Sequence, residues 1–166
     1  MENKRVYVDY LKLRRDFDIL KDINGSQGFC YIKDNLIYKI YYDYLEKEYD
    51  FSIFKSPNIS FPINYLYDKN NKDLNKIVGE IMPYFDKKDI SKSISSDTLL
   101  CDIKRHSLDI IKEINNFPNI KMNDLCWLNL LYNEDGFSII DTTSWIITEE
   151  DISKYLYIPK SSLGSG

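Results

Sequence analysis

Two β-rich runs separated by Asp34-Asn35 constrain the fold of this chain more than any other feature. Residues 29–32 and 36–42 are mostly apolar and aromatic, and the polar residues between them are typical of a tight hairpin turn. If Asp34-Asn35 is the two-residue loop, the register of the hairpin is set, and cross-strand partners share one face of the sheet. The partners expected on one face are Ile32 with Ile37 and Cys30 with Lys39.

Other patterns complete the expected first half of the chain. Residues 6–23 suggest a strand or a short lead-in helix, and residues 25–29 suggest a turn that two glycines permit. Asp43 can cap a helix that runs to Lys55 and ends at Ser56-Pro57. Its core stripe would consist of Leu45, Tyr49 and Ile53. Two further strands are expected at residues 59–67 and 77–82.

The second half combines a long helix with a second hairpin. Thr98–Phe117 is the longest helical pattern, and Pro118 lies just beyond its end. Residues 122–129 are expected to form a loop. Residues 130–132 and 137–140 would then pair as strands across Asn133–Gly136. Six apolar residues recur along the helix: Leu99, Leu100, Ile103, Ile110, Ile111 and Ile114.

Composition places the chain among ordinary globular proteins. Its 166 residues are 43% hydrophobic and carry a net charge of −4, so general nucleic-acid binding is not expected despite the local basic residues of the segment 12–15. No run has the roughly 20 apolar residues of a membrane span, and the N-terminus does not resemble a secretory signal. Three scattered cysteines indicate reduced thiols and a cytoplasmic location. The absence of alanine, with abundant Lys, Ile, Asn and Tyr, favours an AT-rich bacterial or phage genome.

The single histidine limits the kinds of metal site and catalytic site that the sequence supports. With only His106, and no Cys or His pair at ligand spacing, zinc sites and Ser-His-Asp catalysis find little support. The best candidate for a catalytic site instead consists of Asp and Asn side chains, which offer oxygen atoms. Asp124 precedes Asn129 by five residues, and Asp141 ends the apolar run that follows.

This spacing resembles the phosphoryl-transfer site of the protein-kinase-like superfamily. In that family the first Asp accepts the proton of the substrate hydroxyl, and the Asn and second Asp hold Mg²⁺ on the ATP phosphates. The resemblance therefore implies that Asp124 is the catalytic base and that Asn129 and Asp141 are the metal ligands. It implies ATP and Mg²⁺ as cofactors.

Upstream segments follow the same family order. Lys39 resembles the strand lysine that contacts the phosphates, and either Glu46 or Glu48 in the following helix would pair with it. Backbone groups of Glu80 and Met82 would bind adenine, and Gly79 would guard the back of the pocket. Residues that would line the nucleotide site are Gly25, Ser26, Gln27, Gly28, Cys30, Ile37, Lys39, Glu48, Glu80 and Met82.

Several positions depart from the family pattern. Ile23 replaces the first glycine of the Gly-rich loop, Met122 replaces the family His, and Thr142 replaces the glycine after the metal-binding Asp. Only 25 residues follow Asp141, which implies a truncated C-terminal lobe. The chain could be a fragment, a reduced kinase, or a relative that has lost catalysis.

The expected fold is therefore α+β: a two-lobed kinase-like fold, with a small antiparallel sheet and one helix joined to a reduced helical C-lobe. The expected divisions are residues 1–82, 83–160 and a flexible tail at 161–166. The leading function is an ATP- and Mg²⁺-dependent phosphotransferase acting on a hydroxyl of a protein or a small molecule. The alternative is a catalytically reduced binding protein that regulates or inhibits a partner. Apolar residues left uncovered on the Thr98–Phe117 helix predict a homodimer or a protein partner through the C-terminal half.

Overall fold

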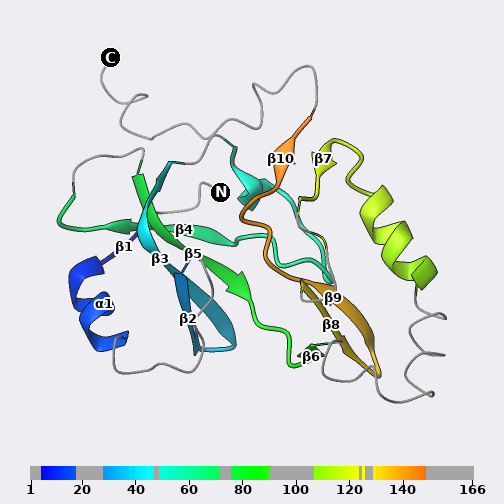
Figure 1. Cartoon of the computed structure of the whole chain (residues 1–166), viewed down its shortest axis with the longest axis horizontal. Helices are drawn as coiled ribbons and strands as arrows, with labels where there is room; N and C mark the ends of the chain where they lie inside the picture. Colours follow the sequence, from blue (N-terminus) through cyan, green and yellow to red (C-terminus); the bar gives the residue numbers. More distant parts are fainter. Residues whose placement is uncertain are drawn as a thin grey trace. The chain divides into compact units, whose positions relative to one another are not determined.

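The computed structural model describes residues 5–17, 28–46, 49–71, 76–89, 107–123, 125 and 129–148. They form an α+β structure with two compact units (Figure 1). The first unit contains the described residues up to Phe54 and those from Phe61 to Tyr84. The second contains Lys55–Ser60 and the described residues from Phe85 onward. Within the described ranges, no helix has both the length and the apolarity needed to cross a bilayer.

A five-stranded sheet, in the order β1-β4-β5-β3-β2, forms the first unit (Figure 1). The neighbours β2–β3, β3–β5 and β5–β4 are antiparallel, whereas β1 is parallel to β4. The sheet is therefore mixed, and the prediction of a purely antiparallel sheet is wrong. The strands are β1 (Val6–Val8), β2 (Gly28–Lys33), β3 (Leu36–Glu46), β4 (Asn64–Asp68) and β5 (Lys76–Pro83).

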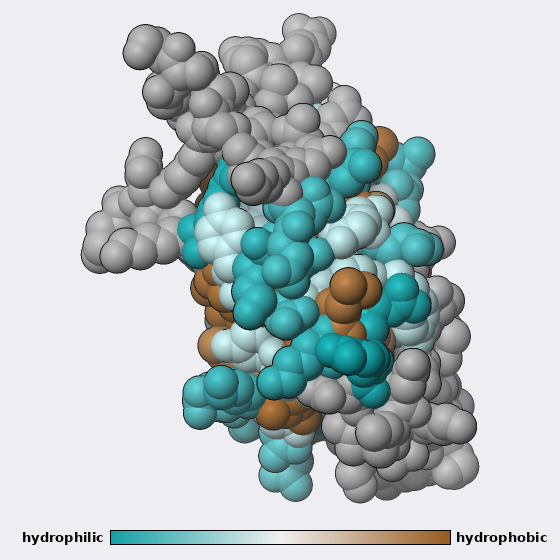
Figure 2. Space-filling view, turned by 90° about the vertical axis from the view of Figure 1, so that its left-hand side faces the viewer, coloured by the Kyte–Doolittle hydropathy of each residue, from teal (hydrophilic) through white to brown (hydrophobic). Residues whose placement is uncertain are grey.

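The helix α1 (Tyr10–Phe17) packs on one face of this sheet. Tyr10 is 3% exposed, and its hydroxyl donates to the carbonyl oxygen of Tyr41 at 2.7 Å, so the helix is tied to β3. Val6 and Val8 of β1 join the same core, which explains why the strand before the helix is held on the sheet. The buried members of this cluster are Tyr10, Phe29, Ile40, Leu66, Val78 and Ile81. On the face of the molecule that Figure 2 shows, the coloured residues are hydrophilic and hydrophobic side chains interspersed.

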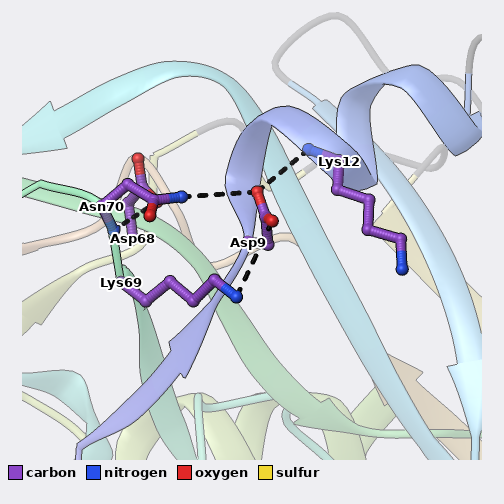
Figure 3. Close-up of polar contacts among 5 residues, drawn as sticks. All are labelled: Asp9, Lys12, Asp68, Lys69 and Asn70. Carbon is purple, nitrogen blue, oxygen red and sulfur yellow. Dashed lines mark hydrogen bonds and ion pairs between the residues drawn. The ribbon is translucent and has the colours of Figure 1, made fainter.

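A polar cluster joins the start of α1 to the end of β4 (Figure 3). The carboxylate of Asp9 accepts from the backbone N–H of Lys12 at 3.2 Å and lies 3.8 Å from the ammonium of Lys69. Asp68 is 4% exposed, and its side chain accepts from the backbone N–H of Asn70 and from the hydroxyl of Tyr44. Asp9 caps the first turn of the helix in the usual manner of an N-terminal Asp, while Asp68 orders the turn that follows β4.

The β2–β3 hairpin is confirmed with the predicted register. Cys30 is opposite Lys39, and Ile32 is opposite Ile37. Asp34 and Asn35 form the loop with φ values of 52° and 62°. Positive φ at both loop residues is the signature of a type I′ turn, whose twist matches that of paired strands.

The predicted helix from Asp43 to Lys55 is wrong. Strand β3 continues to Glu46, and its Leu45 is opposite Ile77 of β5. Among the described residues that follow, Phe51–Ile53 forms a 3₁₀ turn, capped by the Asp50 side chain. Tyrosine-rich sequence favours a strand here, and Leu45 gains a buried partner by packing on an aromatic cluster instead of a helix. That cluster contains Tyr41, Tyr65, Tyr67 and Ile77. The predicted strand at 59–67 also starts later, at Asn64.

The described residues of the second unit form short sheets and a helical segment at residues 107–115. The second hairpin is confirmed, with Leu130 opposite Ile139 and Asn133 opposite Gly136. Ile59 adds a parallel bridge to Ile139. Residues 98–106 of the predicted long helix lie outside the described residues. The strands are β6 (Lys88–Asp89), β7 (Ile120–Lys121), β8 (Leu130–Asn133), β9 (Gly136–Ile139) and β10 (Ile146–Ile147).

Candidate functional site

Lys39 lies in a row of side chains that crosses four strands of the first unit. Its register partners are Cys30 on β2 and Glu80 on β5, and Glu80 is in turn opposite Tyr65 on β4. Residues directly opposite one another share a face of the sheet, so these four side chains lie on one face. Ile37 is two residues before Lys39 on the same strand and therefore belongs to this face too. The sequence-predicted grouping of Cys30, Ile37 and Lys39 is thus confirmed.

The acidic residues expected to pair with Lys39 are not on a helix as far as the structure describes them. Glu46 is exposed at the end of β3, opposite Lys76. Glu48 lies outside the described residues. Sequence reasoning missed Glu80 as a neighbour of Lys39, because the pairing of β3 with β5 joins residues far apart in the chain and no local pattern sets its register. Glu80 is 1% exposed.

The backbone role predicted for Glu80 receives no support from the sheet. Strand β5 is flanked by β3 and β4, and Glu80 has a register partner on each side. Peptide groups in a central strand are directed at the neighbouring strands, so no edge at Glu80 is open to adenine. Met82 is opposite Ile37, near the end of the strand. Gly79 is opposite Ile40 and Leu66, on the face opposite Lys39, and so does not guard a pocket on the Lys39 face.

Of the turn predicted at residues 25–29, the structure describes Gly28 and Phe29, and both belong to strand β2. A Cβ at Gly28 would lie 2.2 Å from the carbonyl oxygen of Ile40, which is closer than real Cβ contacts. Gly28 is therefore required by the close approach of β2 and β3. Gly25, Ser26 and Gln27 lie outside the described residues, and their phosphate-binding role stays a prediction.

Asn129 and Asp141 lie together at the open end of the β8–β9 hairpin. The backbone N–H of Ile140 donates to the carbonyl oxygen of Asn129 at 2.9 Å, which extends the hairpin pairing by one step beyond Leu130 and Ile139. Asp141 is thus next to the residue bonded to Asn129. Its φ of 64° is left-handed, a conformation that ordinary L-residues adopt only at a cost, although Asp and Asn tolerate it better than most.

Asn123 connects the preceding loop to the segment after Asp141. Its amide nitrogen donates to the carbonyl oxygen of Ser144 at 2.9 Å, and the indole N–H of Trp145 donates to the carbonyl oxygen of Asn123 at 3.1 Å. Trp145 is 3% exposed, so this anchor is buried. Asp124, which follows Asn123 in the sequence, lies outside the described residues.

Asn129 and Asp141 suit Mg²⁺ by the chemistry of their side chains. Both offer oxygen ligands, and Mg²⁺ commonly keeps several waters while it binds one or two protein groups and substrate phosphates. Among the residues that the structure describes, no group of three or more His, Cys, Asp or Glu could hold a metal. A dedicated all-protein cage is therefore not found in that part of the chain, but a site completed by nucleotide phosphates does not need one.

The second unit also contains a hollow of about 370 Å³ that the sequence did not predict. It lies between the helical segment 107–115 and β9. On one wall, the carboxylate of Glu113 accepts from the hydroxyl of Ser56 and from the amide of Asn58 at 3.3 Å. Neither Asn129 nor Asp141 lines it. The lining residues are Asn58, Asp109, Ile110, Lys112, Glu113, Asp135, Gly136, Phe137 and Ile139.

Comparison with protein-family models gave no match, and no curated protein matches the chain in sequence.

Proposed function

We propose that this chain is a kinase-like phosphotransferase that uses ATP and Mg²⁺ to phosphorylate a hydroxyl of a protein or a small molecule. The observation that carries the proposal is the hydrogen bond between Ile140 and Asn129, which brings Asn129 next to Asp141 at the end of one hairpin. These two residues are the metal ligands that the kinase-like resemblance implies. Their proximity supports a shared role in binding one metal ion.

Each residue has a separate task in this proposal. Asn129 and Asp141 would hold Mg²⁺, which neutralises charge on the phosphates when bound. Lys39 would contact the phosphates through its ammonium group. Asp124 would orient the acceptor hydroxyl and take its proton, a positioning and acid–base task that a carboxylate can perform.

The proposal is tested by nucleotide binding measured with and without Mg²⁺. Titration calorimetry of the purified chain with a non-hydrolysable ATP analogue should give Mg²⁺-dependent binding, and Asp141→Ala should abolish that dependence. Glu134→Gln is the matched control, because Glu134 is an exposed carboxylate in the loop of the same hairpin. Equal binding by Asp141→Ala and the control would reject Asp141 as a metal ligand.

Transfer is tested separately from binding. Asp124→Ala should leave Mg²⁺-dependent nucleotide binding within about twofold of the unmodified chain and remove phosphate transfer, since a base acts in the chemical step and not in nucleotide affinity. Release of ADP and autophosphorylation are the measurements. Unchanged transfer by Asp124→Ala would exclude Asp124 as the base.

A second candidate is a catalytically reduced kinase-like protein that regulates or inhibits a partner. The observation that favours it is the continuation of β3 through Glu46, where a glutamate-bearing helix was expected. The family pattern places the glutamate partner of the lysine on that helix. Nucleotide binding without any turnover of ATP or transfer of phosphate would support this second function over the first.

A further inference from the structure

The carboxyl group of Glu80 lies in the interior of the first unit. The residue is 1% exposed and occupies the central strand β5, between β3 and β4. Burying an ionised carboxylate is costly unless a cation or hydrogen-bond donors compensate for its lost hydration. The neighbours of Glu80 on the adjacent strands are therefore the groups to consider first.

Two register partners flank Glu80 on the same face of the sheet. On β4 the partner is Tyr65, whose hydroxyl oxygen accepts from the backbone N–H of Phe51 at 3.1 Å. On β3 the partner is Lys39, which is half-buried. Directly opposed residues in an antiparallel pair have Cβ atoms roughly 4.5–5.5 Å apart, so the long Lys39 side chain can bring its ammonium to the Glu80 carboxylate.

Other acidic residues near Lys39 in the sequence have less favourable positions where they are described. Glu46 is on the same strand as Lys39 but is exposed and opposite Lys76. Asp43 is also exposed on β3. Glu48 lies outside the described residues and is therefore the competitor that an experiment must examine.

We infer that Glu80, from the centre of β5, is the carboxylate that holds Lys39 in position for a nucleotide phosphate. The role of the nucleotide in this inference rests on the proposed function. The pairing of Lys39 with Glu80 rests on the sheet register alone. Glu80 is a positioning residue in this scheme, because it acts through Lys39. A strand would then supply the carboxylate that the sequence pattern assigned to a helix.

The pair itself is tested by urea unfolding, which requires no nucleotide. Lys39→Met and Glu80→Gln should each lower the urea midpoint, and the double variant should lose clearly less than the sum of the two single losses, since interacting residues are not additive. The exchange variant Lys39→Glu/Glu80→Lys should recover part of the loss. An additive double variant would overturn the pairing, even if the exchange variant failed to fold.

The positioning role is tested by binding of Mg²⁺-ATP. Glu80→Gln should weaken binding about tenfold, equivalent to about 1.4 kcal/mol, and Lys39→Met/Glu80→Gln should bind no more weakly than Lys39→Met. Asp43→Asn removes an exposed carboxylate of β3 and is the matched control, which should bind as the unmodified chain does. Weakening by Glu48→Gln with no effect of Glu80→Gln would overturn the inference in favour of Glu48.

The two measurements separate the failure of this inference from failure of the proposed function. If the unmodified chain binds no nucleotide, the proposed function fails, and the unfolding cycle still decides whether Lys39 and Glu80 are coupled. If Mg²⁺-ATP binds but Glu80→Gln changes neither the affinity nor the coupling, the proposed function stands and the role of Glu80 is rejected.

Discussion

Asp141 combines a left-handed backbone with a side chain that is proposed to bind metal. A φ of 64° costs an ordinary L-residue roughly 1–2 kcal/mol. The cost is smaller for Asp, and glycine adopts this conformation without it. Strained residues persist when the surrounding structure determines their conformation, and they cluster at functional sites. The hairpin pairing at Ile140 and the turn from Thr142 to Trp145 supply that surrounding structure on either side.

We therefore predict different effects of two substitutions at Asp141 on stability. Asp141→Ala should be less stable than Asp141→Gly by about 1 kcal/mol, because alanine pays the cost of positive φ and glycine does not. Both should lose Mg²⁺-dependent nucleotide binding, because both lack the carboxylate. Urea unfolding of the two variants checks the first expectation, and equal stabilities would show that the φ of Asp141 stores no strain.

Tyr44 provides a pH-dependent contact at the residue scale. Its hydroxyl donates to Asp68 at 2.7 Å, and this hydrogen bond to a carboxylate is the main cause that raises the pKa of Tyr44 above its ordinary value of 10.0, with burial adding to the rise and a hydrogen bond to Asn71 opposing it. A raised pKa in the folded state means that the folded chain holds the proton more tightly than the unfolded chain. The stabilisation is complete below the unfolded pKa and is lost as the pH rises through the folded value.

Tyr44→Phe should therefore reduce the loss of unfolding free energy that occurs as the pH becomes alkaline. As the pH rises above 10.0, the ordinary pKa of the hydroxyl, the unmodified chain should lose more unfolding free energy than Tyr44→Phe, because only the former carries the ionising hydroxyl at this site. Burial is the main cause that raises the pKa of Tyr10, and Tyr44 adds to that rise, so Tyr44→Phe also reduces the Tyr10 contribution and acts in the same direction. Parallel pH profiles for the two chains would contradict this assignment.

At the scale of elements, the β2–β3 hairpin is determined by its turn. Asp34 and Asn35 both have positive φ, and glycine is the preferred second residue of a type I′ turn. We predict that Asn35→Gly raises the unfolding free energy by a few tenths to about 1 kcal/mol, whereas Asn35→Val lowers it, because a β-branched residue is strained at positive φ. Thermal unfolding is the measurement, with Lys33→Gln, an exposed strand position beside the turn, as a control.

Strand β3 extends beyond the residues for which the local sequence predicts a strand. Its pairing with β5 is interrupted between Ile40 and Leu45 by a register shift, and the strand resumes pairing at Leu45 and Glu46. Bulges of this kind bend a strand without ending it. The bend lets Tyr41 and Leu45 reach the same aromatic cluster as Tyr65, which a helix starting at Asp43 would not have required.

At the scale of the whole molecule, association remains a prediction. On the helical segment 107–115, Leu108 is 66% exposed and Ile111 is 52% exposed, and a spacing of three residues puts them on one side of the helix. Adjacent exposed apolar side chains are the kind of surface that a partner covers. We expect the chain to form dimers at micromolar concentration or to bind a protein partner through this segment.

Sedimentation velocity tests the dimer directly. Leu108→Glu/Ile111→Glu should shift the chain to monomers, and Asn115→Glu, an exposed change on the same helical segment, should not. A concentration-independent monomer for the unmodified chain would remove the homodimer from consideration.

The sequence by itself determined the two hairpins and the side chains that they bring together. Turn chemistry and strand alternation act over a few residues, so the register of Cys30 with Lys39 and the pairing of Leu130 with Ile139 followed from local patterns. The proximity of Asn129 to Asp141 is a consequence of the second hairpin. The metal-ligand hypothesis therefore needed no tertiary information.

Only the tertiary structure decided the course of residues 43–46 and the neighbours of Lys39. The spacing of Leu45, Tyr49 and Ile53 fits a helix, but pairing of Leu45 with Ile77 and burial against tyrosines favoured a strand. The same holds for β1, which pairs in parallel with β4, and for Glu80 of β5, which is opposite Lys39 of β3. Such contacts join residues far apart in the chain, and their free energy comes from partners that no local pattern contains.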